Sequence, residues 1–112
     1  MVDATANRTY IHEHMKIEFA DKRLALIRTD RAHELGLPFG VVKSCRDKLD
    51  FMESAPDERS IRNWKSLNYK KIGDGEAAPR QVRINDQYRI VFHLETETNP
   101  PTLTVLEIGD PH

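Results

Sequence analysis

Two arginines and a terminal acid and imidazole are the groups in this sequence best suited to chemistry. Arg83 and Arg89 flank the short polar segment 85–87, and the chain ends with Asp110 and His112. A guanidinium binds phosphate through paired hydrogen bonds, and an imidazole gains or loses a proton near neutral pH. Together such groups can hold a phosphate and move a proton beside it, which is the chemistry that cleaves an RNA backbone without a metal.

The two arginines lie in a predicted β-hairpin. Apolar and polar residues alternate over residues 80–84 and 88–94, as in strands with one buried face. A three-residue loop pairs apolar with apolar positions and places Arg83 opposite Arg89, whereas a two-residue loop would pair apolar with basic positions. The hydrophobic pattern therefore predicts the three-residue loop 85–87, with both arginines on the face away from the core.

Like charges directly opposite each other destabilise a sheet, so the arginine pair needs a counter-charge. A bound phosphate would supply one. Alternatively, an acidic residue neutralises the pair, and Asp86, Glu97 and Glu107 are the candidates. Glu107 is among them because the β-branched segment 102–108 is predicted to join the same sheet.

Charge is distributed unevenly along the chain. Residues 59–93 hold eight Lys/Arg and three acidic residues, whereas residues 94–112 hold four acidic residues and no Lys/Arg. A basic band beside an acidic rim can bind a polyanion locally although the formal net charge is −1. An ordinary solvated surface would have the same composition.

The first half of the domain is predicted to be a short strand followed by helices. Residues 15–19 alternate as a strand, and Asp21 is expected to cap a helix with Leu24, Ile27 and Leu26 turned inward. The segment 35–38 ends that helix and starts another. The inward stripe of this second helix is Val42, Cys45, Leu49 and Met52.

A short helical piece is predicted after Pro56. Asp57 is positioned to cap it, and Ile61, Trp64 and Leu67 recur every three residues. This spacing predicts Trp64 as a core anchor, and the alternative is a ring that stacks on a base.

Length and composition predict one compact domain. The chain has 112 residues and 38% hydrophobic content. Residues 1–14 are polar without periodicity, which predicts a flexible N-terminal extension before a domain over 15–112. The sequence has neither an apolar run near the ~20 residues of a membrane span nor a signal-peptide pattern, so a cytoplasmic protein is expected. One cysteine and five scattered histidines show no metal-ligand spacing, so neither metal nor another cofactor is expected.

The hairpin resembles a known family. Residues 83–90, Arg-Ile-Asn-Asp-Gln-Tyr-Arg-Ile, are similar to the Arg-Ile-Asn-Asp-Gln-Trp-Arg-Ile hairpin of HigB-type toxins in the RelE/ParE superfamily (plasmid maintenance system killer family), and residues 110–112 are similar to their terminal Asp-Tyr-His. The resemblance implies a small single α+β domain. In it, an N-terminal strand and two to three helices pack on a mainly antiparallel sheet of four to five strands.

The resemblance also implies a function. Such toxins belong to type II toxin–antitoxin systems, and most are ribosome-dependent messenger RNA endoribonucleases that inhibit translation by metal-independent attack of a 2′-OH on phosphate. The implied partners are a helix-turn-helix antitoxin of the HigA type, the ribosome and messenger RNA, with no membrane. The alternative is a non-catalytic or degenerate toxin that acts by binding, as a ParE-like gyrase inhibitor or as an antitoxin partner only.

The site residues follow from the match, position by position. Arg83 and Arg89 are expected to stabilise the charge on the phosphorane, His112 to act as general acid and Asp110 to orient it. The residues expected to bind substrate are Lys70, Lys71, Arg80 and Tyr88, and one of the two lysines would neutralise phosphate or help to deprotonate the 2′-OH.

Two departures from the family pattern favour the alternative. Pro111 replaces the penultimate tyrosine, and residues 69–73 replace a His-x-x-Lys-Gly stretch.

Overall fold

The structure, a computed structural model, describes residues 14–111. The predicted extension 1–14 therefore lies outside the described residues, except for His14. His112 lies outside them as well.

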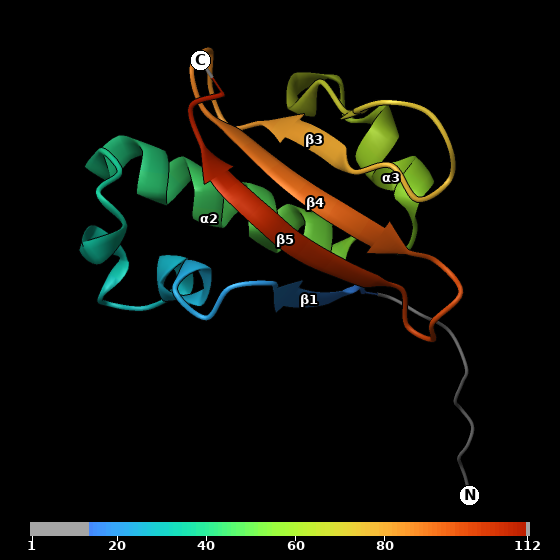
Figure 1. Cartoon of the computed structure of the whole chain (residues 1–112), viewed down its shortest axis with the longest axis horizontal. Coiled ribbons are helices and arrows are strands. Elements are labelled where there is room, and N and C mark those ends of the chain that lie inside the picture. The colour runs from blue at the N-terminus through green and yellow to red at the C-terminus, as the bar shows by residue number, and fades with distance from the viewer. Residues whose placement is uncertain (1–13, 112) are drawn as a thin grey trace, which may run out of the picture.

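A five-stranded sheet forms one layer of the molecule, and its strand order is β1-β5-β4-β3-β2 (Figure 1). Only the β1–β5 pair is parallel, and the other three pairs are antiparallel. The strands are β1 (Lys16–Phe19), β2 (Lys70–Lys71), β3 (Arg80–Arg83), β4 (Arg89–Glu95) and β5 (Thr102–Gly109).

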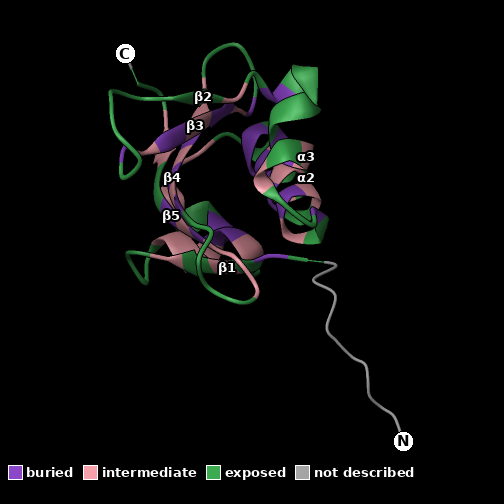
Figure 2. Cartoon of the chain, turned by 90° about the vertical axis from the view of Figure 1, so that its right-hand side faces the viewer, coloured by how far each residue is buried: buried purple, intermediate pink, exposed green. Residues whose placement is uncertain are grey.

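The helices form the second layer. The α-helices are α2 (Phe39–Ser54) and α3 (Glu58–Asn63), and three short 3-10 helices are η1 (Leu24–Arg28), η2 (Ala32–Leu35) and η3 (Lys65–Leu67). Helices α2 and α3 lie on one face of the sheet, and the buried residues gather between the two layers (Figure 2). The opposite face, called the open face below, is not covered by either α-helix. The predicted α+β domain, with an N-terminal strand and a mainly antiparallel sheet, is confirmed.

Helix α2 packs through the stripe that the sequence predicted. Val42, Cys45, Leu49 and Met52 are all buried, at 3-4-3 spacing on one side of the helix. They share one core with Phe92, Leu103 and the other apolar residues on the covered face of the sheet. The helix ends at Ser54, because the following Ala-Pro pair disfavours helical backbone.

The cap of α3 is also as predicted. The Asp57 carboxylate accepts a hydrogen bond from the Ser60 backbone N–H at 2.9 Å. This bond satisfies one of the N–H groups that the first turn of a helix leaves without a partner.

The prediction of one helix after Asp21 is wrong, because η1 and η2 are separate 3-10 turns. Ile27 is buried as expected, whereas Leu24 and Leu26 are half-buried. In a continuous helix these backbone groups would bond to one another, but here they bond to a side chain. The Thr29 hydroxyl donates to the Leu26 carbonyl and accepts from the Arg31 N–H.

The Arg46 guanidinium of α2 also bonds to backbone groups at this interruption. Arg46 donates to the carbonyls of Ile27 and Thr29, both at 2.6 Å. The interruption is therefore fixed by α2 and not by the local sequence alone.

The prediction that Trp64 anchors the core is also wrong. Helix α3 ends at Asn63, and Trp64 has extended backbone angles, so the three-residue spacing does not continue as one helical face. Ile61 and Leu67 are buried, but Trp64 is 37% exposed. Its ring packs on Phe51 of α2 with 3.8 Å between the ring centroids, and the Lys48 ammonium lies 5.7 Å from its centroid.

Within residues 14–111, no helix has both the length and the apolar character needed to cross a membrane.

Candidate functional site

The hairpin has the predicted register. Val82 lies opposite Ile90 and Arg83 lies opposite Arg89. The Ile84 N–H donates to the Tyr88 carbonyl at 2.9 Å, which closes a loop of three residues. Since Val82 and Ile90 are buried and side chains alternate along a strand, both arginines lie on the open face.

The Asn85 side chain shapes this loop. Its carboxamide oxygen accepts hydrogen bonds from the backbone N–H groups of Gln87 at 2.9 Å and Tyr88 at 2.8 Å. An Asn side chain that bonds to the backbone two or three residues ahead stabilises a tight turn. The loop therefore holds the two arginine strands at a fixed register.

The two arginines have different partners. Arg83 forms an ion pair with the Asp86 carboxylate, and Arg89 donates to the carbonyls of Asn85 at 2.6 Å and Tyr88 at 3.0 Å. Of the three acids proposed as counter-charges, Asp86 fills that role for Arg83. The Arg83 and Asp86 side chains are 42% and 92% exposed. An ion pair in water at such exposure contributes at most about 1 kcal/mol, so an incoming phosphate can displace the Asp86 carboxylate.

The end of β5 lies beside this hairpin (Figure 1). Gly109 lies opposite Arg89, and the Gln87 side-chain amide donates to the Asp110 carboxylate at 2.9 Å. The structure thus brings three of the four predicted catalytic residues, Arg83, Arg89 and Asp110, to one corner of the sheet. The fourth, His112, lies outside the described residues and remains a prediction.

The two lysines of β2 lie on opposite faces. Lys70 lies opposite Gln81 and Lys71 lies opposite Arg80, and both lysines are exposed. Because directly opposed residues share a face, Lys70 lies on the open face with Arg83, whereas Lys71 lies on the covered face. Of the pair, Lys70 is placed for the predicted role beside the arginines.

Two further predicted substrate-binding residues lie on the covered face. Tyr88 is half-buried against the core. Arg80 is buried at 7% exposure, and its guanidinium lies 3.5 Å from the Glu58 carboxylate and 3.1 Å from the Tyr69 hydroxyl. The structure does not bring either residue together with Arg83, because positions 80 and 83 on one strand face opposite ways.

Arg80, Glu58 and Tyr69 form a cluster of polar contacts between the helical layer and the sheet. The Tyr69 hydroxyl donates to the Glu58 carboxylate, and burial together with this hydrogen bond raises the pKa of Tyr69 to about 12. The phenol therefore stays protonated at neutral pH and serves as a fixed donor. Glu58 belongs to α3 and Arg80 to β3, so the contact is structural in character.

Besides this corner, a metal-ligand cluster or the single thiol would be a further candidate group for chemistry. Residues 14–111 contain no group of three or more His, Cys, Asp or Glu side chains that could hold a metal ion. Burial raises the pKa of the Cys45 thiol to about 12, so this thiol is a packing group and not a nucleophile.

Sequence reasoning missed one residue of this corner, Gln87, which joins the hairpin loop to Asp110. No local signal marks it, since the bond joins residues 23 positions apart. Glu107 was predicted only as a counter-charge, and it makes no ion pair with either arginine in the described part of the chain. A β-bulge determines its position, as described below.

Comparisons with known proteins add a fold likeness. The chain is similar to a solved structure described as a YoeB/ParE toxin from Agrobacterium tumefaciens, with 16% sequence identity and a TM-score of 0.48, over 88% of this chain and 100% of that chain. No protein-family model matches the sequence, and no curated protein matches it.

Proposed function

We propose that this protein is the toxin of a type II toxin–antitoxin pair and that it cleaves messenger RNA on the ribosome without a metal. The observation that supports the proposal is the corner of the sheet to which Arg83, Arg89 and Asp110 all belong. It joins the two parts of the sequence, the hairpin and the chain end, that resemble HigB-type toxins. The proposed partners are a helix-turn-helix antitoxin, the ribosome and its message.

The two guanidinium groups bind the scissile phosphate in this mechanism. Directly opposed residues on antiparallel strands have Cβ atoms about 5 Å apart, a spacing at which two arginines can grip one phosphate. Each well-placed donor stabilises the phosphorane by about 3 to 4 kcal/mol relative to the ground state. Lys70, on the same face one strand further out, adds positive charge along the backbone of the RNA.

The terminal residues supply the proton in this mechanism. His112 protonates the departing 5′-oxygen, and Asp110 orients the imidazole. The bond from Gln87 to Asp110 holds the end of β5 against the loop 85–87, which joins the two strands that carry the arginines. An open sheet face suits an extended polyanion better than a small molecule, which usually binds in an enclosed cavity.

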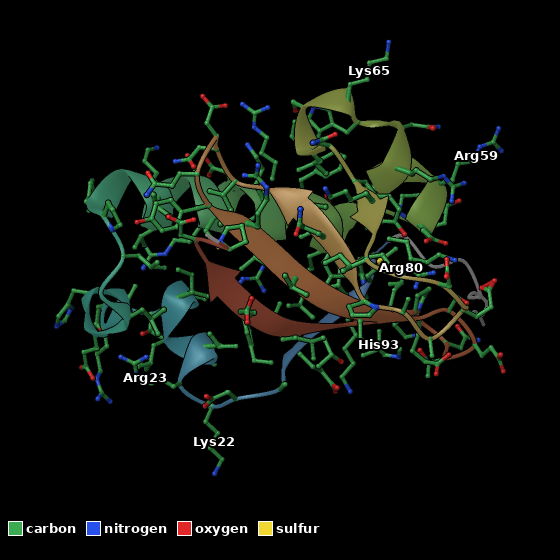
Figure 3. The ribbon with its side chains drawn as sticks, turned by 45° about the horizontal axis from the view of Figure 1, so that its top comes forward. Lys22, Arg23, Arg59, Lys65, Arg80 and His93 are labelled. Carbon is green, nitrogen blue, oxygen red and sulfur yellow. The ribbon has the colours of Figure 1, made fainter. Side chains whose placement is uncertain are left out.

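The test is to incubate purified protein with translating ribosomes and to map the new RNA ends. We expect cuts in the decoding site that leave a 2′,3′-cyclic phosphate and a 5′-OH, and no cut where a 2′-deoxynucleotide replaces the attacking nucleotide. Arg89→Ala should abolish cutting. Arg59→Ala is the matched control, since Arg59 belongs to the same basic band but projects outward from α3 (Figure 3).

Intact RNA with wild-type protein would contradict the nuclease proposal. If DNA gyrase supercoiling were inhibited in the same preparation, the binding alternative would replace it. The Asp86 carboxylate on Arg83 and the proline at position 111 are the features that favour this second candidate.

A further inference from the structure

A β-bulge in β5 changes which residues of the strand face the arginines. Val91 of β4 pairs with Glu107, but the next residue, Phe92, pairs with Val105, so Leu106 is an extra residue in β5. Before the bulge, Leu103 and Val105 are buried, whereas the bulge residue Leu106 and the next residue, Glu107, are both exposed. An extra residue shifts the alternation of side chains by one position.

The shift places Glu107 on the open face. In a regular strand, position 107 would share the covered face with Leu103 and Val105, and position 108 would face outward. With the bulge, Ile108 lies opposite buried Ile90 and packs against the core, and Glu107 lies opposite Val91 on the open face. The fold therefore moves a carboxylate from a position where it would be costly to a position beside the candidate site.

Glu107 is a near neighbour of Arg89. Gly109 lies directly opposite Arg89, and Glu107 is two residues from Gly109 on the same face, about 7 Å along the strand. Its carboxylate is exposed and makes no hydrogen bond or ion pair within residues 14–111. On the open face, Lys70 and Glu107 lie in line with Gln81 and Val91, in the row next to the one that Arg83, Arg89 and Gly109 form.

We infer that Glu107 is the general base of the proposed site. The inference rests on the proposed function and adds the group that accepts the proton of the attacking hydroxyl. The Glu107 carboxylate takes the proton from the 2′-OH as the 2′-oxygen bonds to phosphorus. The bond from phosphorus to the 5′-oxygen breaks, and that oxygen takes a proton from His112. The products are a 2′,3′-cyclic phosphate and a 5′-OH, with no redox change.

The charge states favour Glu107 over the lysine for this role. An ammonium group has three N–H donors and no acceptor, whereas an ionised carboxylate can only accept. Lys70 can therefore neutralise the charge of the phosphate, and Glu107 can accept the proton of the 2′-OH. The Asp110 carboxylate is already the acceptor for Gln87, which leaves it suited to orienting the chain end.

The experiment measures single-turnover cleavage by Glu107→Gln on two messages bound to ribosomes. One message is normal, and the other carries a sulfur in place of the 5′-oxygen at the mapped cut. A thiolate leaves without protonation, so this message compensates for a missing acid but not for a missing base. Glu18→Gln is the matched control, since Glu18 is an exposed open-face glutamate of the neighbouring strand β1, paired with Lys16 at 3.1 Å.

For Glu107→Gln we expect cleavage of both messages to fall by at least about 100-fold, with RNA binding unchanged or tighter. Glu18→Gln should stay within about twofold of wild type, because exposed ion pairs contribute little. Removal of His112 should slow cleavage of the normal message and leave the cleavage rate of the sulfur message unchanged.

Two results would overturn the assignment: Glu107→Gln cutting both messages at the wild-type rate, or its defect being restored by the sulfur leaving group. Failure of the wild-type protein to cut either message would instead count against the proposed function itself, on which the assignment depends.

Discussion

Arg80 and Arg83 lie on the same four-residue strand, yet their surroundings are opposite. Arg80 faces the helical layer with a side chain only 9% exposed, whereas Arg83 lies on the open face with a side chain 42% exposed. The three-residue separation alone puts them on different faces. For this protein, the face of the sheet and not the residue type separates a structural arginine from a candidate site residue.

The two ion pairs also differ in what they can contribute. The Arg80–Glu58 pair is mostly removed from water, and Arg80 further donates to the Glu76 carbonyl at 3.1 Å. Removing the Arg80 guanidinium takes away several of these bonds at once, although Glu58 keeps the Tyr69 hydroxyl and Arg62 at 3.8 Å. The Arg83–Asp86 pair is solvated, so its loss changes stability little and leaves the guanidinium available to a ligand.

The sharpest test of this difference is Arg80→Ala. We expect a loss of about 3 kcal/mol in the free energy of unfolding, because a buried guanidinium that bonds to Glu58, Tyr69 and the Glu76 carbonyl is removed. Urea denaturation of purified protein measures it. Arg83→Ala should cost less than about 1 kcal/mol under the same conditions. Equal losses in the two variants would show that the two faces are not energetically distinct.

The reverse pattern is expected for activity. Arg89→Ala and Arg83→Ala should each lower single-turnover cleavage by about 10² to 10³, the cost of losing one donor to the transition state. Both variants should keep the thermal unfolding profile of a folded protein. A correctly folded Arg89→Ala variant that cuts at the wild-type rate would remove Arg89 from the site.

Sequence reasoning predicted those features that depend on a regular period. The register of the hairpin followed from matching buried positions, because a slip of one residue would turn every apolar side chain to solvent. The buried stripe of α2 followed in the same way from its 3-4-3 spacing. Arg83 and Arg89 could be predicted as neighbours because the two-residue alternation of the paired strands places both side chains on one face.

The errors occur where a tertiary contact or an irregularity interrupts a period. Arg46 of α2 takes carbonyls that a helix after Asp21 would have used, and no pattern within that segment reveals it. Trp64 follows the helical spacing of its neighbours but lies just after α3 has ended. The bulge at Leu106 depends on the pairing of β5 with β4, so the face on which Glu107 lies could not be predicted from the alternation of β5 alone.

Lys70 and Lys71 also lie on opposite faces of the sheet, and we expect their loss to have different but smaller effects on cleavage. Lys70→Ala should lower cleavage by about tenfold, because it removes one positive charge from the face that holds the RNA. Lys71→Ala should have almost no effect, since that ammonium lies on the other face. Cleavage at several salt concentrations measures both, and the salt dependence should weaken for Lys70→Ala only. Equal losses would contradict the β2 register.

The smallest expected effect is that of Asp86→Asn. The Asp86 carboxylate forms an ion pair with Arg83, so it competes with phosphate for the same N–H donors. Since the side chain is 92% exposed, the substitution should leave the free energy of unfolding within about 0.5 kcal/mol of wild type. RNA affinity should rise by a few-fold, about 0.5 to 1 kcal/mol, because an exposed ion pair no longer has to be broken. Asp74→Asn is the control, an acidic residue of the same basic band in the turn after β2. Weaker binding by Asp86→Asn would mean that the carboxylate positions Arg83 for phosphate instead of competing with it.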